Sequence, residues 1–198
     1  MSARSSVLIG DDGRTRCGWA GTDPEYQRYH DEEWGVPLHG DRPLFEKLSL
    51  EAFQSGLSWL TILRRRTAFR SAFCGFDIAG IAAFDETDVD RLVLDASIIR
   101  NRAKIVATIG NARVANALIG PTPGALDELM WGHAPPGRSR PSTLDDVPTS
   151  TAESTALSVR LRVLGFRFVG PTTIYALMQS TGMVDDHVVG CFRARHPI

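Results

Sequence analysis

The sequence predicts an all-α fold. Apolar residues recur at helical spacing in several segments, and residues suited to helix caps precede those segments. No clear run of residues alternates between polar and apolar, and the one weak strand candidate, residues 166–169, is closed by Gly170 and Pro171. The chain has 198 residues, 43% of them hydrophobic, so it can bury a substantial core. We expect a flexible leader over residues 1–15 and a single domain over residues 16–198.

Two helices are predicted on either side of Gly56. Asp41 and Pro43 mark the start of the first helix, which runs to Gly56. Its apolar stripe contains Leu44, Phe45, Leu48 and Phe53. Ser58 can cap the second helix, and the three arginines at 64–66 favour its C-terminal end.

Further helices are expected in the rest of the chain. Residues 87–93 predict a short helix and residues 101–114 a longer one. Ser150 and Glu153 form a predicted capping box that opens a helix ending at Gly165. Between these helices, residues 120–149 contain six prolines, which is typical of a long surface connection.

A short glycine-bounded segment follows the capped helix. Gly165 ends that helix, and Pro171 begins another after only a few residues. Such a hairpin can point backbone N–H groups, and the positive end of the second helix, at a DNA phosphate. A Gly-Pro turn can also serve only to reverse the chain, so the pattern alone leaves both interpretations open.

Charge and cysteine content exclude several classes of protein. The net charge is −1, from 22 basic and 23 acidic residues, which excludes a strongly basic, histone-like protein but not a DNA-binding one. Basic residues cluster at 64–66, 100–104 and 160–167, although such runs are usually solvated helix faces. Three widely spaced cysteines argue against a disulfide framework. We therefore expect a cytoplasmic monomer that does not enter a membrane.

Four potential metal ligands lie near the two ends of the sequence. His187 and Cys191 are four residues apart after two acidic residues that suit a helix start, so they would project from one helical face. With Cys17 and His30 they make a Cys₂His₂ set, which predicts a zinc site joining the termini. The alternative is that these cysteines pack as small buried hydrophobes, as cysteine often does.

Aromatic residues concentrate in the first third of the chain, near Glu51. One interpretation is a core of aromatic side chains beside an ordinary surface glutamate. The other is a pocket for a flat, cationic ligand, in which indole rings stack and a carboxylate accepts hydrogen bonds from an exocyclic amine. The aromatic residues in question are Trp19, Tyr29, Trp34 and Trp59.

Several of these segments, taken together and in order, resemble a bacterial 3-methyladenine-DNA glycosylase of the constitutive, type I class. The resemblance runs from about Arg16 to Cys191. It rests on residues 16–19, 29–37, 50–63, 98–105, 165–170 and 185–191. It implies the helix-hairpin-helix fold of the DNA glycosylase superfamily. It also implies one structural Zn²⁺ per chain, held by Cys17, His30, His187 and Cys191.

The resemblance further implies roles for the aromatic residues and for the hairpin. Glu51 and Tyr29 would be the catalytic, hydrogen-bonding groups of a base pocket. Trp59 would be its stacking platform, with Trp19 and Trp34 as further walls. DNA contacts would come from the hairpin residues Gly165, Phe168, Gly170 and Thr172, and we expect residues 54–57 to enter the gap in the DNA.

The implied reaction is hydrolysis of the N-glycosidic bond of 3-methyladenine in double-stranded alkylated DNA. The nucleotide is flipped out of the helix, the free base leaves, and an abasic site remains. We find no convincingly placed lysine nucleophile, so we expect no strand cleavage. Two alternatives are a zinc-stabilised helical DNA-binding module without catalysis, and a metallohydrolase. Four protein ligands would leave zinc no open position for water, which disfavours the second.

Overall fold

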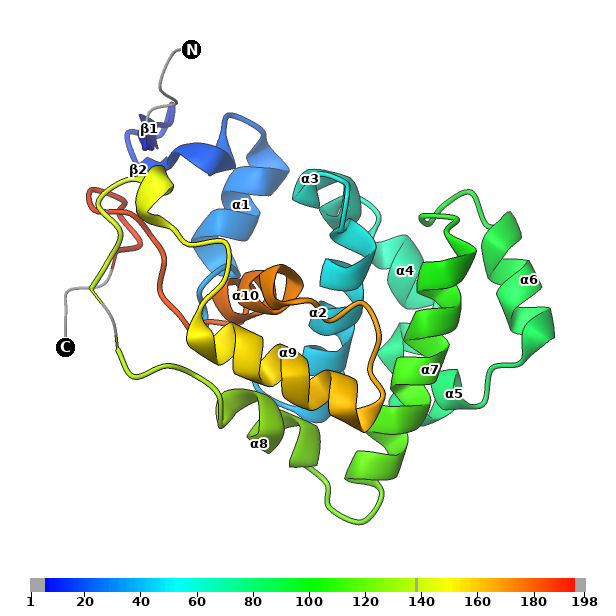
Figure 1. Ribbon diagram of the computed structural model, residues 1–198. Coiled ribbons are helices and arrows are strands. Elements are labelled where there is room, and N and C mark those ends of the chain that lie inside the picture. Colours follow the sequence, from blue (N-terminus) through cyan, green and yellow to red (C-terminus); the bar gives the residue numbers. More distant parts are fainter. Residues whose placement is uncertain (1–5, 138, 195–198) are drawn as a thin grey trace.

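The computed structural model describes residues 6–137 and 139–194, which are mainly helical (Figure 1). This confirms the predicted helical character of the chain. The α-helices are α1 (Pro24–Glu32), α2 (Asp41–Gln54), α3 (Trp59–Leu63), α4 (Arg66–Ala72), α5 (Ile78–Ala82), α6 (Glu86–Leu94), α7 (Arg102–Ile119), α8 (Ala125–Trp131), α9 (Ala152–Leu164) and α10 (Pro171–Ser180). Short 3₁₀ helices are η1 (Gly18–Ala20), η2 (Cys74–Phe76) and η3 (Leu144–Asp146).

The N-terminal segment forms a small antiparallel hairpin of β1 (Val7–Ile9) and β2 (Thr15–Cys17), in which Val7 lies opposite Cys17. The hairpin lies partly within the expected leader over residues 1–15, of which residues 1–5 lie outside the described residues. Strands of three residues are too short for an alternating pattern to reveal. The backbone N–H of Phe192 donates to the carbonyl of Thr15 at 2.8 Å, so the hairpin is also fixed to the C-terminal segment.

Several predicted helix boundaries are confirmed, and one cap is shifted. Helix α2 begins at Asp41, and the side chain of Ser58 accepts a hydrogen bond from the backbone N–H of Thr61 at the start of α3. The cap of α9 is Thr151, not Ser150 as predicted. Its partner is Ser154, whose hydroxyl accepts from the Thr151 N–H as a glutamate would in the usual capping box.

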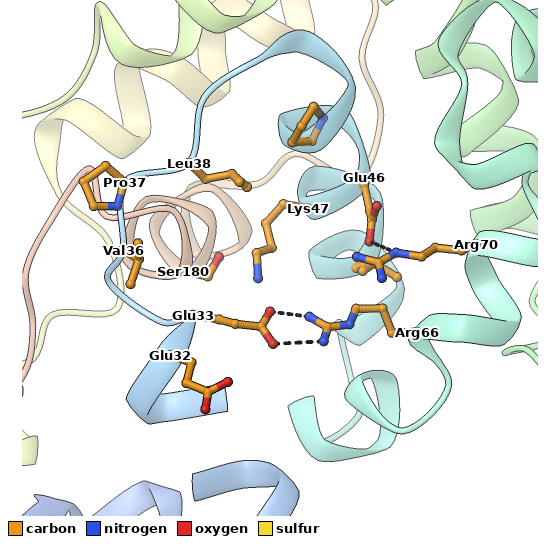
Figure 2. Close-up of a pocket in the computed structure, with 12 residues that line it drawn as sticks. Glu32, Glu33, Val36, Pro37, Leu38, Glu46, Lys47, Arg66, Arg70 and Ser180 are labelled. Carbon is orange, nitrogen blue, oxygen red and sulfur yellow. Dashed lines mark hydrogen bonds and ion pairs between the residues drawn. The ribbon is translucent and has the colours of Figure 1, made fainter. Parts of the chain in front are cut away.

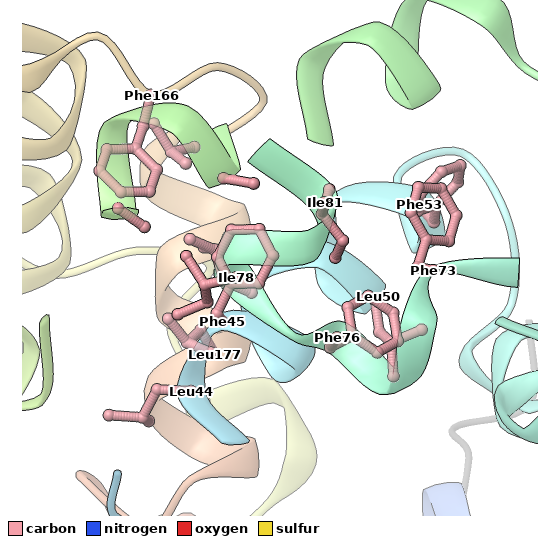
Figure 3. Close-up of a cluster of buried hydrophobic side chains, with 14 of the residues drawn as sticks. Leu44, Phe45, Leu50, Phe53, Phe73, Phe76, Ile78, Ile81, Phe166 and Leu177 are labelled. Atoms are coloured by element: carbon pink, nitrogen blue, oxygen red, sulfur yellow. The ribbon is translucent and has the colours of Figure 1, made fainter. Parts of the chain in front are cut away.

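Helix α2 runs through the centre of the molecule beside α10 (Figure 1). Its residues 47–53 are all buried, polar side chains included. Figure 3 shows Phe53 close to Phe73, which follows α4, with Phe76 of η2 nearby. Burial of each such side chain contributes roughly 1.5–3 kcal/mol, so packing alone holds α2 firmly in place. This fixes the position of Glu51 in the middle of the helix.

Helices α9 and α10 are joined by a tight loop over residues 165–170, as the sequence predicted. Gly165 closes α9 in a left-handed conformation, with φ of 104°. Asn111 of α7 braces the loop: its side chain donates to the carbonyl of Arg167 at 3.0 Å and accepts from that residue's N–H at 2.7 Å. The hydroxyl of Ser158 donates to the carbonyl of Val169 at 2.6 Å.

Helices in the described part of the chain fall short of what a membrane span needs in length or apolar character.

Candidate functional site

Three of the four predicted metal ligands meet where the two ends of the chain come together, and the fourth, His187, lies beside them. Cys17 ends β2, His30 lies in α1, and His187 and Cys191 lie in the segment that follows α10. The donor atoms of Cys17, His30 and Cys191 all lie within 4.8 Å of one another, and all three residues are buried. The ring of His187 is 5.0 Å from that of His30, measured between centroids.

Carboxylates orient both imidazoles of this cluster. Nδ1 of His30 donates to Asp31 at 2.8 Å, and Nδ1 of His187 donates to Asp185 at 2.9 Å. Nε2 of His30 therefore faces the cluster, at 3.4 Å from Sγ of Cys191. Among the described residues, Nε2 of His187 has no hydrogen-bond partner although it is buried. Carboxylate-backed histidines with a free Nε2 are typical of metal ligands.

The two thiols are close enough to share a proton. A hydrogen bond from Cys17 lowers the pKa of Cys191, with His30 adding to the effect against the cost of burial. The pKa of Cys17 is raised, first by its hydrogen bond to Cys191 and then by burial. A thiolate is thus favoured inside the cluster. Two sulfur and two imidazole donors are the set that tetrahedral zinc prefers, so the residues present fit the ion.

The predicted helix carrying His187 and Cys191 is not present. Residues 185–191 form an irregular segment, and Asp185 binds the N–H and ring of His187 instead of starting a helix. Asp186 accepts hydrogen bonds from the hydroxyl of Tyr175 at 2.5 Å and from Gln179 at 2.9 Å, both in α10. These side-chain bonds hold the segment against α10 without a helical backbone.

Gly35 allows the chain after α1 to approach this segment closely. Its φ is +74°, and a Cβ atom placed there would lie 2.8 Å from the ring of His187. Any other residue would therefore displace a potential ligand.

A second cluster forms a cavity of about 210 Å³ next to these histidines. It brings together all five predicted pocket residues, namely Trp19, Tyr29, Trp34, Glu51 and Trp59. Its other lining residues, which the sequence analysis missed, are Tyr26, Gln54, Ala176, Gln179 and Ser180. Tyr26 and Gln54 could have been found, because each lies three residues from a predicted pocket residue on the same helix.

Glu51 is a buried carboxyl group in this cavity, with 4% of its surface exposed. Burial raises its pKa to about 7, against the opposing effects of the Lys47 ammonium and the Ser180 hydroxyl. Near neutral pH the group is therefore poised between its neutral and ionised forms. An ionised carboxylate here would bind a cation, or an amine donor, strongly because little water competes.

Aromatic rings enclose the carboxyl group. The ring of Tyr29 lies 5.5 Å from that of Trp59 and 6.4 Å from that of Trp19. Burial raises the pKa of Tyr29 well above its ordinary value, so its hydroxyl remains a hydrogen-bond donor. Trp34 lies 4.6 Å from the ring of His187 and 4.9 Å from that of Trp19. The potential metal site and the cavity therefore share a wall.

Lys47 is a further charged residue that the sequence analysis missed. It precedes Glu51 by one helical turn on α2, and its Nζ lies 4.9 Å from the ring centre of Tyr29 and 5.3 Å from that of Trp59. The i, i+4 spacing of a lysine and a glutamate was visible in the sequence. That both side chains are buried could not be read from it.

The loop between α2 and α3 forms the rim of the cavity. Lys104 of α7 donates from its ammonium to the carbonyls of Phe53 at 2.9 Å and Ser55 at 2.6 Å. The side chain of Gln54 donates to the carbonyl of Leu57 at 2.8 Å. The loop is thus tied down at its base, while Leu57 remains 39% exposed.

The predicted DNA-binding residues lie on the α9–α10 loop and not in the cavity. Gly170 caps α10, Thr172 is exposed, and Phe168 is 40% exposed with φ of 56°. Helix α10 connects the two regions, because it begins at this loop and carries Ala176, Gln179 and Ser180 to the cavity.

Comparisons with known proteins point to one family. The sequence model of the methyladenine glycosylase family matches residues 19–194. The chain is 48% identical to DNA-3-methyladenine glycosylase 1 of Escherichia coli (strain K12) over 178 residues, which cover 89% of this chain and 95% of that protein.

Solved structures of similar proteins agree with this match. A crystal structure of 3-methyladenine DNA glycosylase I superimposes with a TM-score of 0.87 at 44% identity, covering 92% of this chain and all of that one. A structure of 3-methyladenine DNA glycosylase I from Staphylococcus aureus, solved to explain its recognition of 3-methyladenine, has a TM-score of 0.83 at 32% identity. It covers 88% of this chain and 94% of that one.

Proposed function

The chain belongs to the methyladenine glycosylase family, and we propose that it is a DNA-3-methyladenine glycosylase, which hydrolyses the N-glycosidic bond of 3-methyladenine in alkylated DNA. One observation carries this proposal above the others: a buried carboxyl group, Glu51, lies among aromatic rings in a cavity of about 210 Å³. A flat, cationic base would find both stacking surfaces and a counter-charge there.

The reaction begins with extrusion of the damaged nucleotide from the DNA helix, which methylation makes easier because it weakens pairing and stacking. Methylation at N3 leaves the purine positively charged, so the base is already a good leaving group. The bond between the sugar C1′ and the base nitrogen breaks, and its electron pair goes to the base. Water then attacks C1′ and loses a proton, which leaves an abasic site.

Protein groups contribute by binding the base and stabilising positive charge. Glu51 accepts from the exocyclic amine, a charge-assisted hydrogen bond of roughly 1.5–3 kcal/mol. Trp59 stacks on the ring, which contributes about 1–3 kcal/mol. Tyr29 fixes the edge of the base, and Trp19 and Trp34 complete the walls. The carboxylate also favours the oxocarbenium-like transition state, because positive charge on the sugar develops near it.

Zinc has a structural role in this proposal. Cys17, His30, His187 and Cys191 would hold one Zn²⁺, supported by the free Nε2 of His187 and the carboxylates behind both imidazoles. Four protein ligands complete the coordination of the ion, so it would join the chain termini and brace the pocket wall without activating water.

Contacts to double-stranded DNA are assigned to the two loops described above. The N–H groups around Gly165, Phe168, Gly170 and Thr172 would bind phosphate at the start of α10, as helix N-termini commonly do. This helix-hairpin-helix arrangement needs little net positive charge. Residues 54–57 would enter the gap that the flipped nucleotide leaves.

The proposed enzyme has no lyase activity. The chain contains two lysines, Lys47 and Lys104, and neither lies in the loop over residues 165–170. The Lys104 ammonium is bound by two backbone carbonyls. We also propose that the protein acts in the cytoplasm, since its three cysteines form no disulfide, and as a monomer, since the residues that line the pocket all come from one chain.

Release of free bases from N-methylated DNA tests this proposal. The protein is incubated with the DNA, and the products are resolved by chromatography. We expect release of 3-methyladenine and much less 7-methylguanine, whose different edge would not satisfy Glu51. Tight binding to DNA without release of any base would favour the non-catalytic DNA-binding module instead.

A further inference from the structure

A second cavity, of about 230 Å³, lies beside the base pocket (Figure 2). Ser180 lines both cavities. Figure 2 shows the side chain of Lys47 extending toward Ser180 and Glu33, with two ion pairs around it. These pairs join Glu33 to Arg66 and Glu46 to Arg70. Of the three carboxylates that line this cavity, Glu33 and Glu46 are therefore paired with arginines, and the Lys47 charge is additional to these pairs.

Lys47 is buried, with 8% of its surface exposed. Its ammonium lies 3.5 Å from the hydroxyl of Tyr29 and faces the rings of Tyr29 and Trp59 at 4.9 and 5.3 Å. These are the two residues assigned to the edge and the face of the base. Burying an ammonium group costs free energy, which its contacts with the two aromatic residues partly offset. The same contacts help to fix the positions of Tyr29 and Trp59.

We propose that Lys47 is a positioning residue of the base pocket, which favours the ionised form of the Glu51 carboxyl group before the base arrives and holds the ring of Tyr29 in place. The role of Lys47 in base binding rests on the proposed function. Its electrostatic effect on Glu51 does not depend on that function. Lys47 lines the second cavity, so its charge acts on the pocket from behind the aromatic wall.

Charges around Glu51 support this assignment. Within α2, Lys47 is the cation that favours the ionised carboxylate, and Tyr26 and Tyr29 face it from α1 as neutral groups. Burial lowers the pKa of Lys47, but the Glu51 and Glu33 carboxylates oppose that effect, with a smaller contribution from Glu46. Arg66 acts in the opposite sense on Lys47. The cation and the carboxylate therefore stabilise each other's charged forms.

The inference predicts how Glu51 titrates in variants at position 47. Lys47→Met removes the charge with little change of length, and Lys47→Arg keeps the charge, for which the second cavity offers space. Arg70→Gln is the matched control, because it removes a cation that borders the same cavity but pairs with Glu46. Carbon-13 NMR of the glutamate carboxyl groups follows Glu51, with its signal assigned by its loss in Glu51→Gln.

We expect the Glu51 midpoint to rise by about one pH unit or more in Lys47→Met, since removing a neighbouring opposite charge has an effect of that size. It should remain near the native value in Lys47→Arg and in Arg70→Gln. The rate of base release should fall off on the acidic side at a pH that is higher by the same amount in Lys47→Met. If that variant misfolds by circular dichroism, Lys47→Gln replaces it.

An unchanged Glu51 midpoint in a folded, uncharged variant at position 47 would overturn the inference. A native protein that frees no base from methylated DNA would overturn the proposed function instead, and the NMR titration would still decide the role of Lys47. The two failures are therefore distinguishable.

Discussion

Nε2 of His30 lies 3.4 Å from Sγ of Cys191, although 161 residues separate the two in sequence. The ring of His30 also packs 5.2 Å from that of Trp19, which lines the base pocket. This contact closes the chain on itself and joins the potential metal site to the pocket. The geometry of the pocket therefore depends on the join between the chain termini.

Cys191→Ser should remove bound zinc and destabilise the protein. The variant lacks one of four ligands, and loss of a structural metal belongs to the mutations that cost more than about 4 kcal/mol. Metal content by atomic emission and thermal melting measure the two effects. Cys74→Ser is the control, because Cys74 is exposed. Unchanged zinc content and melting in Cys191→Ser would contradict the assignment.

Asp185→Asn should weaken zinc binding without removing a ligand. The Asp185 carboxylate accepts from Nδ1 of His187, and loss of such a partner typically lowers metal affinity about 10- to 100-fold. Competition with a chromophoric chelator measures the affinity. Asp145→Asn, at an exposed position in η3, should behave like the native protein. Equal affinities in all three proteins would show that Asp185 does not support a ligand.

The identities of the residues were enough to predict which side chains the structure brings together at the cavity and near the chain termini. Donor type and the four-residue spacing selected His187 and Cys191, and the nearby aromatic residues selected Glu51, to which the resemblance then gave a role. The local structure around them was harder to predict. An i, i+4 pair indicated a helix for His187 and Cys191, but the structure holds them in an irregular segment tied to α10 by Asp186. Such tertiary bonds leave no local pattern.

Burial was the other property that the sequence could not give. Lys47 lies on α2 at a spacing typical of a surface lysine beside Glu51, but the packing of α10 against α2, with Tyr29 of α1 beside the ammonium, buries both. Similarly, the three-residue strands of the N-terminal hairpin are too short to show an alternating pattern. They are held by pairing with each other and by the hydrogen bond between Thr15 and Phe192.

Trp59→Ala should weaken binding of free 3-methyladenine by about 10- to 100-fold, the range expected for loss of one stacking surface. Trp59→Phe should retain most of the affinity, because a phenyl ring still stacks. The indole Nε1 of Trp59 is buried and has no hydrogen-bond partner in the described part of the chain, so its loss leaves no protein acceptor unpaired. Fluorescence or calorimetric titration measures the affinities, and equal binding by the alanine variant would rule out stacking.

Glu51→Gln should increase stability at alkaline pH. Burial raises the pKa of Glu51 from 4.5 to about 7, so the native state keeps a proton that the unfolded chain loses between these values. Native stability therefore falls as the pH rises through 7. Glutamine does not titrate. The free energy of unfolding of the variant, minus that of the native protein, should therefore be larger at pH 8 than at pH 4 by up to about 3 kcal/mol. Urea unfolding at both values tests this, and a pH-independent difference would contradict a buried, titrating carboxyl group.

Base release by the native chain and by Glu51→Gln is the most direct test of the central claim. Both proteins are incubated with N-methylated DNA, with Glu46→Gln as a control on the same helix but outside the base pocket. We expect the native chain and the control to free 3-methyladenine, and folded Glu51→Gln to be slower by about 10- to 100-fold, the worth of one charge-assisted hydrogen bond. Equal rates for all three proteins would contradict the role of Glu51, and no release by the native chain would contradict the glycosylase function itself.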